Sequence, residues 1–221
     1  MQVPASELSA VILAGGRGAR LPGKCYRRLG DKELILHVLD RVSQATQEIV
    51  VSVKSKEQAV RVAQLRLLVQ VVLDDSQSQS PLIGFLLGLR VVKGMYVFAA
   101  PCDTAFIEPG VIKLLLQRAI GNDGAIPLNE DNFLELLCAV YRRKSAQLAA
   151  EESIEEGDLS MHAMVARLPM FVRVPMEDIQ TVDPNLLSLR NINTELDLVL
   201  ASDLVHRKKE TSKVLESYRK D

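Results

Sequence analysis

Aromatic side chains are scarce in this chain of 221 residues, because phenylalanine, tyrosine and tryptophan together make up 4% and tryptophan is absent. Proteins that bind single-stranded nucleic acid stack the bases on aromatic rings, so this scarcity argues against that class. The formal net charge is -1 at pH 7, and lysine and arginine are scattered along the chain. Duplex nucleic acid requires a basic surface. We therefore expect no nucleic-acid partner.

Long apolar runs and paired cysteines are also missing. No run approaches the length of a membrane span, and the first residues, MQVPASELSAVILAGG, lack the basic stretch of an export signal. Cys25, Cys102 and Cys138 are odd in number, far apart and never form CxxC, which suggests neither a disulfide framework nor a zinc site. We expect a cytoplasmic protein with reduced thiols and no membrane partner.

The apolar residues that are present alternate in period along the chain. Hydrophobic residues make up 48% of the sequence, enough for one sizeable core. Runs rich in valine, isoleucine and leucine alternate with helical segments, which is typical of βαβ units. We expect strands at about Ser9 to Ala14, Glu48 to Val53, Leu68 to Leu73 and Met95 to Ala100. Helices are expected at Glu33 to Ala45, Lys56 to Gln64 and Pro81 to Val92.

The alternation continues in the second half of the chain. A helix is expected from Pro109 to Ile120, strands in GAIPL and FLELLCAVYRR, and a charged helical region from Arg143 to Arg167. Thr194 and Asp197 form a capping box that predicts a C-terminal helix. The sequence therefore predicts one α/β domain over residues 1–221, with a three-layer, doubly wound, mostly parallel sheet of the Rossmann-like kind.

A glycine-rich segment, LAGGRGARLPGK at residues 13–24, directly follows the first expected strand. Ligands bind beyond the carboxyl ends of the strands in an open parallel sheet. Glycines let backbone N–H groups approach phosphate oxygens, and cations supply countercharge. The glycines are Gly15, Gly16 and Gly18, and the cations are Arg17, Arg20 and Lys24. We predict a triphosphate-binding loop; a structural turn, with Arg17 facing solvent, stays open as the alternative.

Two better-known glycine motifs do not fit this segment. Gly18 to Lys24 satisfies GxxxxGK, but Cys25 follows where a P-loop has serine or threonine, and Gly30 makes a turn where a long helix should continue. A dinucleotide fingerprint would need a third glycine at position 21, which is leucine, and Pro22 would interrupt its helix. Neither motif explains the loop.

Four motifs resemble those of the molybdenum cofactor guanylyltransferases, within the superfamily of GT-A-like NTP transferases. They are LAGGRGARLPGK, SPLIGFLLGL, PCDTAFI and NINTELDL, in the order of that family. LGDKELILHVLDRV at residues 29–42 also resembles the segment that follows the family's loop. The chain departs from the family pattern at Gly23, Ser80 and Ala105, and VVSVKSK lacks the family's base-contacting asparagine.

The resemblance implies transfer of GMP from GTP to molybdopterin cofactor, with Mg2+ as cofactor and pyrophosphate as product. It implies an NTP-binding half at about residues 1–105 and an acceptor-binding half at about 106–221. Adenosylcobinamide phosphate, a sugar phosphate and phospholactate stay open as acceptors, and so does a non-catalytic nucleotide-binding module. The oligomeric state is also open, a homo-oligomer included.

The resemblance also implies site residues. Its nucleotide-binding positions are Leu13, Ala14, Gly15, Gly16, Arg17, Gly18, Lys24, Asp75, Leu82 and Gly84, with Asp75 chosen over Asp74. Lys24 and Arg20 would neutralise phosphate charge, and Asp103, which follows an expected strand, would ligate magnesium as the third catalytic residue. Asn191 and Asn193 alternate along an extended segment and would bind the acceptor, Asn193 also serving as a metal ligand. Turn-forming roles for Asp103 and both asparagines, and a plain helix start at SPLIG, stay open.

Overall fold

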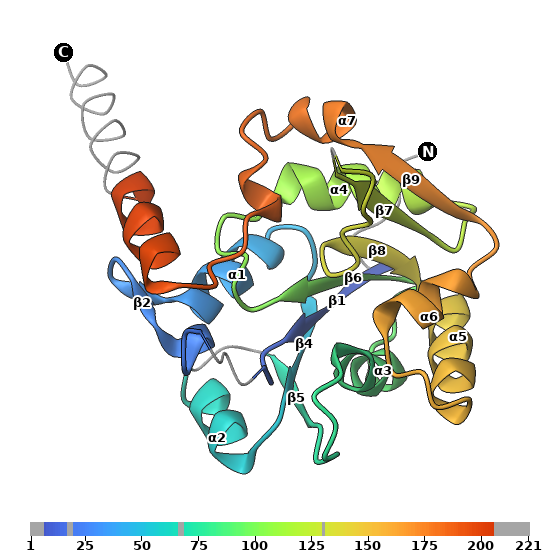
Figure 1. Cartoon of the computed structure of the whole chain (residues 1–221), viewed down its shortest axis with the longest axis horizontal. Coiled ribbons are helices and arrows are strands. Elements are labelled where there is room, and N and C mark those ends of the chain that lie inside the picture. Colours follow the sequence, from blue (N-terminus) through green and yellow to red (C-terminus); the bar gives the residue numbers. More distant parts are fainter. Residues whose placement is uncertain (1–6, 17–19, 66–68, 130, 206–221) are drawn as a thin grey trace.

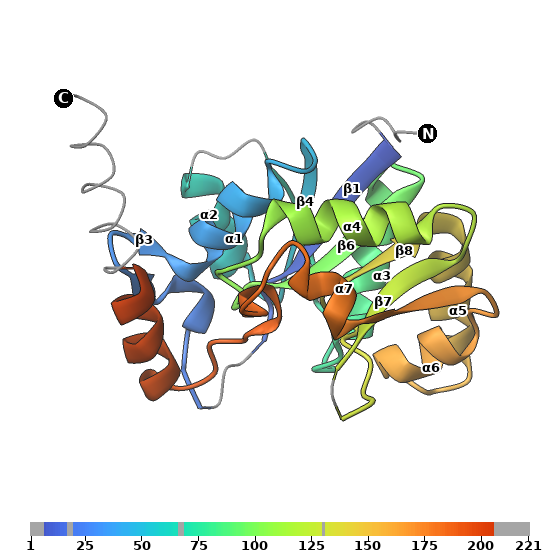
Figure 2. The same ribbon diagram turned by 90° about the horizontal axis from the view of Figure 1, so that it is seen from above.

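A central sheet of seven strands, covered by helices on both faces, organises the computed structural model (Figures 1 and 2). The structure describes residues 7–16, 20–65, 69–129 and 131–205. The strand order is β5-β4-β1-β6-β8-β7-β9, and within the described residues only β8 runs antiparallel to its neighbours. The strands are β1 (Leu8–Leu13), β4 (Glu48–Val53), β5 (Gln70–Leu73), β6 (Tyr96–Pro101), β7 (Gly124–Leu128), β8 (Ala139–Arg142) and β9 (Phe171–Pro175).

The helices form the outer two layers and confirm the predicted three-layer, doubly wound fold. They are α1 (Leu34–Val42), α2 (Lys56–Gln64), α3 (Pro81–Val91), α4 (Pro109–Ala119), α5 (Arg143–Glu155), α6 (Met161–Ala166) and α7 (Met176–Gln180). Side chains alternate along β1, so Ile12 packs in the core with α1 and α4, whereas Val11 packs with α3 and α5 on the opposite face. No helix in the described ranges is long and apolar enough to cross a membrane.

The second half of the sheet departs from the expected pattern at β8. The segment FLELLCAVYRR was expected to be one strand, but only its end forms β8, and Leu134 makes an isolated bridge to Leu128. The described part of the connection between β7 and β8 contains no crossover helix, so β8 returns antiparallel to β7. The expected helical region from Arg143 to Arg167 divides into α5 and α6.

The segment after the glycine-rich loop is a short turn and a hairpin. Lys24–Tyr26 forms a single turn of 3-10 helix, η2, and the two-residue strands β2 (Arg28–Leu29) and β3 (Lys32–Glu33) follow. Gly23 and Gly30 have φ values of 64° and 65°, a region that favours glycine. The long helix of a P-loop is therefore absent after Lys24, as predicted.

A small apolar cluster joins three distant parts of the chain. Leu21 and Leu29 contact Phe106 beyond β6, and the same cluster includes Ile192 and Leu198 from the C-terminal segment. Residues 195–205 form a helix that lies beside β2 (Figure 1). Its start confirms the predicted capping box, because the backbone N–H of Asp197 donates to Thr194 Oγ1 at 3.1 Å and that of Thr194 to Asp197 Oδ2 at 2.8 Å.

The prediction of three reduced thiols is wrong. Cys25 and Cys102 form a disulfide with their Cα atoms 5.4 Å apart, and only Cys138 is a free cysteine. The partners are separated by 77 residues and carry no spacing motif, so the sequence alone did not indicate the pair. The fold brings them together at the carboxyl end of β6, where both cysteines belong to one buried cluster.

Candidate active site

The site forms where the central strands β1 and β6 end side by side. These strands are parallel, with Leu13 paired to Pro101, and the backbone N–H of Cys102 donates to the carbonyl of Leu13 at 3.1 Å. The residues that follow each strand must therefore meet at the same edge of the sheet. This geometry brings the glycine-rich segment beside Asp103.

Lys24, Asp103 and Asn193 converge from three separate segments. The Lys24 ammonium donates to Asp103 Oδ2, and it lies 3.3 Å from Asn193 Oδ1. The side chain of Asp103 is only 3% exposed. The backbone N–H of Ile192 donates to the Asp103 carbonyl at 3.0 Å and so fixes the asparagine segment against the end of β6. Three of the predicted catalytic and metal-binding residues are therefore in contact.

One oxygen of this cluster has no partner in the described part of the chain. Asp103 Oδ1 is buried and accepts no hydrogen bond there. A buried, unpaired carboxylate oxygen is costly unless a ligand satisfies it. A cation could be held by the Asp103 carboxylate together with the amide oxygen of Asn193. The described residues contain no group of three or more His, Cys, Asp or Glu side chains that could hold a metal ion.

A first cavity of about 230 Å³ lies between the glycine-rich segment and α3. Its wall combines backbone of the loop, two lysines and one buried carboxylate. The predicted residues Leu13, Gly15, Gly16, Lys24 and Gly84 line it, together with Ser52, Lys54, Asp74 and Ser80. Five of the predicted nucleotide-binding positions therefore share one cavity.

The choice between the two aspartates after β5 needs correction. Asp74 is 2% exposed and lines the first cavity, whereas Asp75 is exposed and is not part of its lining. The backbone N–H of Asp74 donates to the Val53 carbonyl at 2.8 Å, which continues the β4–β5 ladder by one residue. Side chains alternate along this extended backbone, so neighbouring aspartates face different surroundings. The carboxylate that lines the first cavity is therefore that of Asp74.

Lys54 is a site residue that the sequence analysis missed. Its ammonium lies 2.7 Å from Asp74 Oδ2 and donates to Ser76 Oγ at 3.0 Å and to the Ser78 carbonyl. It therefore holds the segment after β5 against the end of β4. A Cβ atom on Gly15 would lie 2.6 Å from Lys54 Cγ, which explains why glycine stands there. The available signal was a lone cation directly after a parallel strand.

Several other predicted residues lie beside the cavity rather than on its surface. Leu82 and Ala14 are fully buried in the core, and Arg20 is exposed outside the lining of the cavities described here. Gly84 has a packing role as well, because a Cβ there would lie 2.8 Å from Ser52 Oγ at the α3–β4 contact. The predictions for Arg17 and Gly18 lie outside the described residues.

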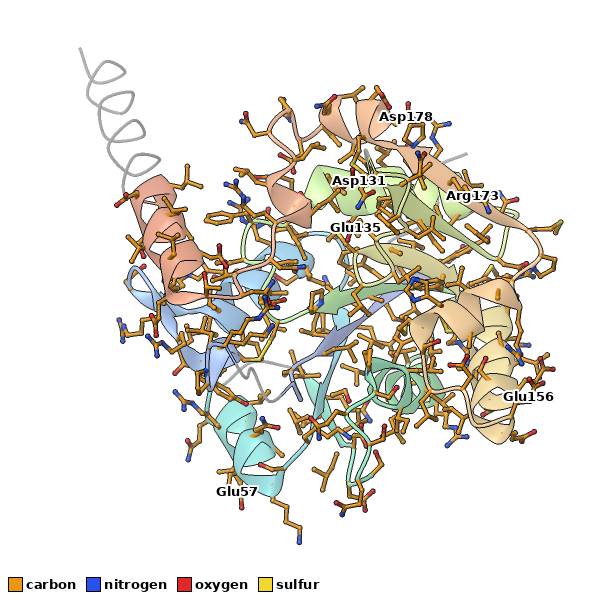
Figure 3. The ribbon with its side chains drawn as sticks, in the orientation of Figure 1. Glu57, Asp131, Glu135, Glu156, Arg173 and Asp178 are labelled. Carbon is orange, nitrogen blue, oxygen red and sulfur yellow. A yellow bond between two sulfur atoms is a disulfide. The ribbon has the colours of Figure 1, made fainter. Side chains whose placement is uncertain are left out.

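A second cavity, of about 240 Å³, meets the first at Lys24. Lys24, Asp103, Asn191 and Asn193 line it, together with Thr104, Glu135 and Leu189. Glu135 and Leu189 also line an adjoining open groove of about 800 Å³, whose wall includes Asp131 and Arg190. Figure 3 labels Glu135 and Asp131 at this groove. Both predicted acceptor-binding asparagines therefore face the second cavity.

This arrangement defines a class of protein. Backbone of a glycine-rich segment, a lysine, an aspartate and an asparagine meet at the carboxyl ends of parallel strands, between two cavities that share the lysine. Such a site can hold two anionic ligands against one another and neutralise their charge. These are the requirements of an α/β nucleotidyltransferase.

Comparison with known proteins gives the family within this class. Residues 10–170 match the family model described as a MobA-like NTP transferase domain, and the chain belongs to that family of nucleotidyltransferases. A probable molybdenum cofactor guanylyltransferase from Methanosarcina mazei is 30% identical over 197 residues, covering 86% of this chain and 88% of its own. The molybdenum cofactor guanylyltransferase of Desulfosudis oleivorans is 26% identical over 193 residues, covering 86% and 92%.

A solved structure agrees with these relatives. The crystal structure of molybdopterin-guanine dinucleotide biosynthesis protein A from Archaeoglobus fulgidus is similar to this chain, with a TM-score of 0.77 and 27% identity. The similarity covers 90% of this chain and 99% of that one.

Proposed function

We infer that this protein transfers GMP from GTP to the phosphate of molybdopterin cofactor, forming the guanine dinucleotide cofactor and releasing pyrophosphate. The observation that carries the proposal is the convergence of Lys24, Asp103 and Asn193 between two cavities. One cavity suits the nucleotide and the other the acceptor. The names of the relatives indicate the particular substrates.

Nucleotidyl transfer is an in-line attack of an acceptor phosphate oxygen on the α-phosphorus, so the enzyme acts by positioning and by charge neutralisation. Lys24 lines both cavities and is therefore placed to neutralise charge on both phosphates. Backbone N–H groups at Gly15 and Gly16 would hold the triphosphate. We propose that Arg20 joins them when the nucleotide binds, as its charge approaches the leaving pyrophosphate.

Magnesium fits the residues at the centre of the site. Mg2+ prefers oxygen ligands and usually takes one or two protein groups, with phosphate oxygens and water completing the set. The buried, unpaired Asp103 Oδ1 supplies one ligand and the Asn193 amide oxygen a second. When bound there, the ion would neutralise the charge that develops on the phosphates. Lys24 then remains as the cation that orients them.

The first cavity would also bind the base. Guanine presents neighbouring N–H donors on one edge, and an ionised carboxylate accepts such bonds. Asp74 supplies that carboxylate, and Lys54 keeps it in place at 2.7 Å. We propose that Asp74, together with Gly84 at the start of α3, forms the guanine site.

The second cavity and its groove would bind the acceptor. Asn191 and Asn193 line the cavity next to Lys24, where the acceptor phosphate must lie for attack. The adjoining groove is more than large enough for a ring system beyond that phosphate, because ligand pockets generally span about 300–1,000 Å³. Glu135 and Leu189 connect the two spaces.

A substrate panel tests this proposal. Pyrophosphate release is measured from each of the four NTPs with molybdopterin cofactor, adenosylcobinamide phosphate, a sugar phosphate and phospholactate. We expect turnover with GTP and molybdopterin cofactor only. Turnover restricted to CTP or UTP would contradict guanylyl transfer, and a different acceptor would change the substrate while keeping the chemistry.

An Asp103→Asn variant separates catalysis from simple nucleotide binding. We expect kcat to fall about a hundredfold or more, because the variant removes the charge that holds the cation. Asp178→Asn is the matched control. Asp178 lies on the outer helix α7 (Figure 3) and pairs with Arg118 of α4 at 2.7 Å. A function that survives Asp103→Asn and needs no magnesium would identify a non-catalytic binding module instead.

A further inference from the structure

The disulfide joins the two segments that supply the central ion pair. Cys25 directly follows Lys24, and Cys102 directly precedes Asp103. The Lys24 ammonium and the Asp103 carboxylate are themselves in contact. The disulfide and the ion pair therefore connect the same two segments, because each cysteine is the chain neighbour of one member of the ion pair.

The two sides of this junction are held in different ways. Cys102 continues β6, with its N–H bonded to the Leu13 carbonyl at 3.1 Å. Cys25 lies in the single turn η2, whose backbone hydrogen bonds, Tyr26 N–H to the Gly23 carbonyl and Arg27 N–H to the Lys24 carbonyl, stay within the turn. These bonds shape the turn without linking it to the sheet. Side chains on either side of Cys25 hold the turn to other elements, since the Tyr26 hydroxyl donates to the Gln58 carbonyl at 3.4 Å and Arg27 pairs with Glu195 at 2.6 Å. The disulfide adds a covalent link to the end of β6, directly beside Lys24.

The disulfide is buried beside the first cavity, whose lining includes Cys102. Cys25 is 3% exposed and Cys102 2% exposed, and both pack in the core that includes Ala14. Cys138 is not in a position to replace either partner as a reactive thiolate, because burial, and then the charges of Glu135 and Asp183, raise its pKa to about 12. In the structure the disulfide joins Cys25 and Cys102, and Cys138 is free and buried.

We propose that Cys25 and Cys102 are positioning residues whose disulfide holds Lys24 beside Asp103, so that triphosphate binding and transfer depend on the oxidation state of this pair. The part that concerns transfer rests on the function proposed above; the part that concerns triphosphate binding does not. Reduction by a dithiol breaks the S–S bond and passes two electrons and two protons to the cysteines, while the dithiol closes to its own disulfide.

A thiol count on denatured protein tests the pairing itself. We expect one reactive thiol, that of Cys138, without reductant, and three after reduction. Three thiols in protein purified under oxidising conditions would overturn the proposal.

Calorimetric titration with magnesium and inorganic tripolyphosphate tests the positioning role without relying on the base or the acceptor. We expect reduction to weaken binding about tenfold, because the Lys24 ammonium is then no longer held where it can bond the phosphate oxygens. In Lys24→Met, reduction should change binding less than about twofold, because the ammonium that the disulfide positions is absent from this variant. The variant Cys25→Ser/Cys102→Ser should bind like the reduced protein and ignore reductant, whereas Cys138→Ala should respond as the wild type does.

The titrations are run below the unfolding temperature of every variant, with far-UV circular dichroism recorded on the same samples. If reduction weakens binding equally in wild type and in Lys24→Met, the disulfide stabilises the whole fold rather than the position of Lys24, and the proposal is overturned. A loss of binding that follows a loss of helical signal would overturn it as well. The substrate panel could find no guanylyl transfer while reduction still weakens tripolyphosphate binding in wild type and not in Lys24→Met. The proposed function would then be wrong, and the positioning role of the disulfide would remain supported.

Discussion

At the scale of single residues, the pair Asp74 and Asp75 shows how one position along a strand decides a role. Asp74 is buried in the first cavity beside Lys54, and Asp75 is exposed. Both follow β5 and have the same chemistry. Only their orientation separates a buried carboxylate that lines a cavity from an exposed one.

The two matched variants Asp74→Asn and Asp75→Asn test this assignment. We expect Asp74→Asn to weaken GTP binding about tenfold to a hundredfold, because a charged hydrogen-bond acceptor is lost and Lys54 loses its carboxylate partner. Asp75→Asn should change GTP binding less than about twofold. Calorimetry with GTP and with tripolyphosphate measures both. Equal losses for the two ligands in Asp74→Asn would contradict a contact to the base.

At the scale of elements, Glu48 connects three strands at the edge of the sheet opposite the site. It stands at the start of β4 and accepts hydrogen bonds from the Ser9 hydroxyl of β1 and from the N–H groups of Lys93 and Gly94, at 2.9 and 3.2 Å, before β6. Burial would raise the pKa of Glu48, but these hydrogen bonds outweigh it and hold the pKa below its ordinary value.

This lowered pKa predicts a pH dependence of stability. A group whose pKa is depressed by folding stabilises the native state above its unfolded pKa, and that contribution is lost as pH falls through the folded pKa. We expect Glu48→Gln to be less stable than wild type at pH 7, with a difference that shrinks below about pH 4. Urea unfolding from pH 7 to pH 3 measures this. The exposed Glu155→Gln is the control, and kcat at pH 7 should stay unchanged in both; a stability difference as large at pH 3 as at pH 7 would contradict the role of the charge.

At the scale of the whole molecule, the disulfide closes a long loop. Its partners are 77 residues apart. Restricting a loop of that length in the unfolded chain stabilises the native state by roughly 4 kcal/mol. For a chain of this size we expect reduction to lower the unfolding temperature by about 10 °C.

Differential scanning calorimetry of oxidised and reduced protein measures this shift. Cys25→Ser/Cys102→Ser should unfold with the reduced protein at the lower temperature. Cys138→Ala serves as the control that still responds to reductant, although its own cavity lowers stability as well. Identical unfolding temperatures in the two oxidation states would contradict the expectation.

Strong local patterns made much of the fold predictable. The strand Glu48–Val53 and the helix Lys56–Gln64 occur at their predicted bounds, because their apolar residues repeat with a clear period and Ser55 caps the helix. The segment before β8 was less predictable, since its apolar residues pack as an irregular connection rather than a strand. The repeat of apolar residues along a segment does not show whether a strand runs parallel or antiparallel to its neighbours.

The sequence by itself determined the mostly parallel α/β fold and the glycine-rich segment, and it predicted Lys24, Asp103 and Asn193 as site residues, because each depends on local pattern or on a motif. Tertiary structure alone decided that Asp74 rather than Asp75 faces the cavity, that Lys54 supports it, and that Cys25 meets Cys102. These facts depend on how strand ends far apart in the chain are brought together and which way each side chain turns there. No spacing along the chain encodes them.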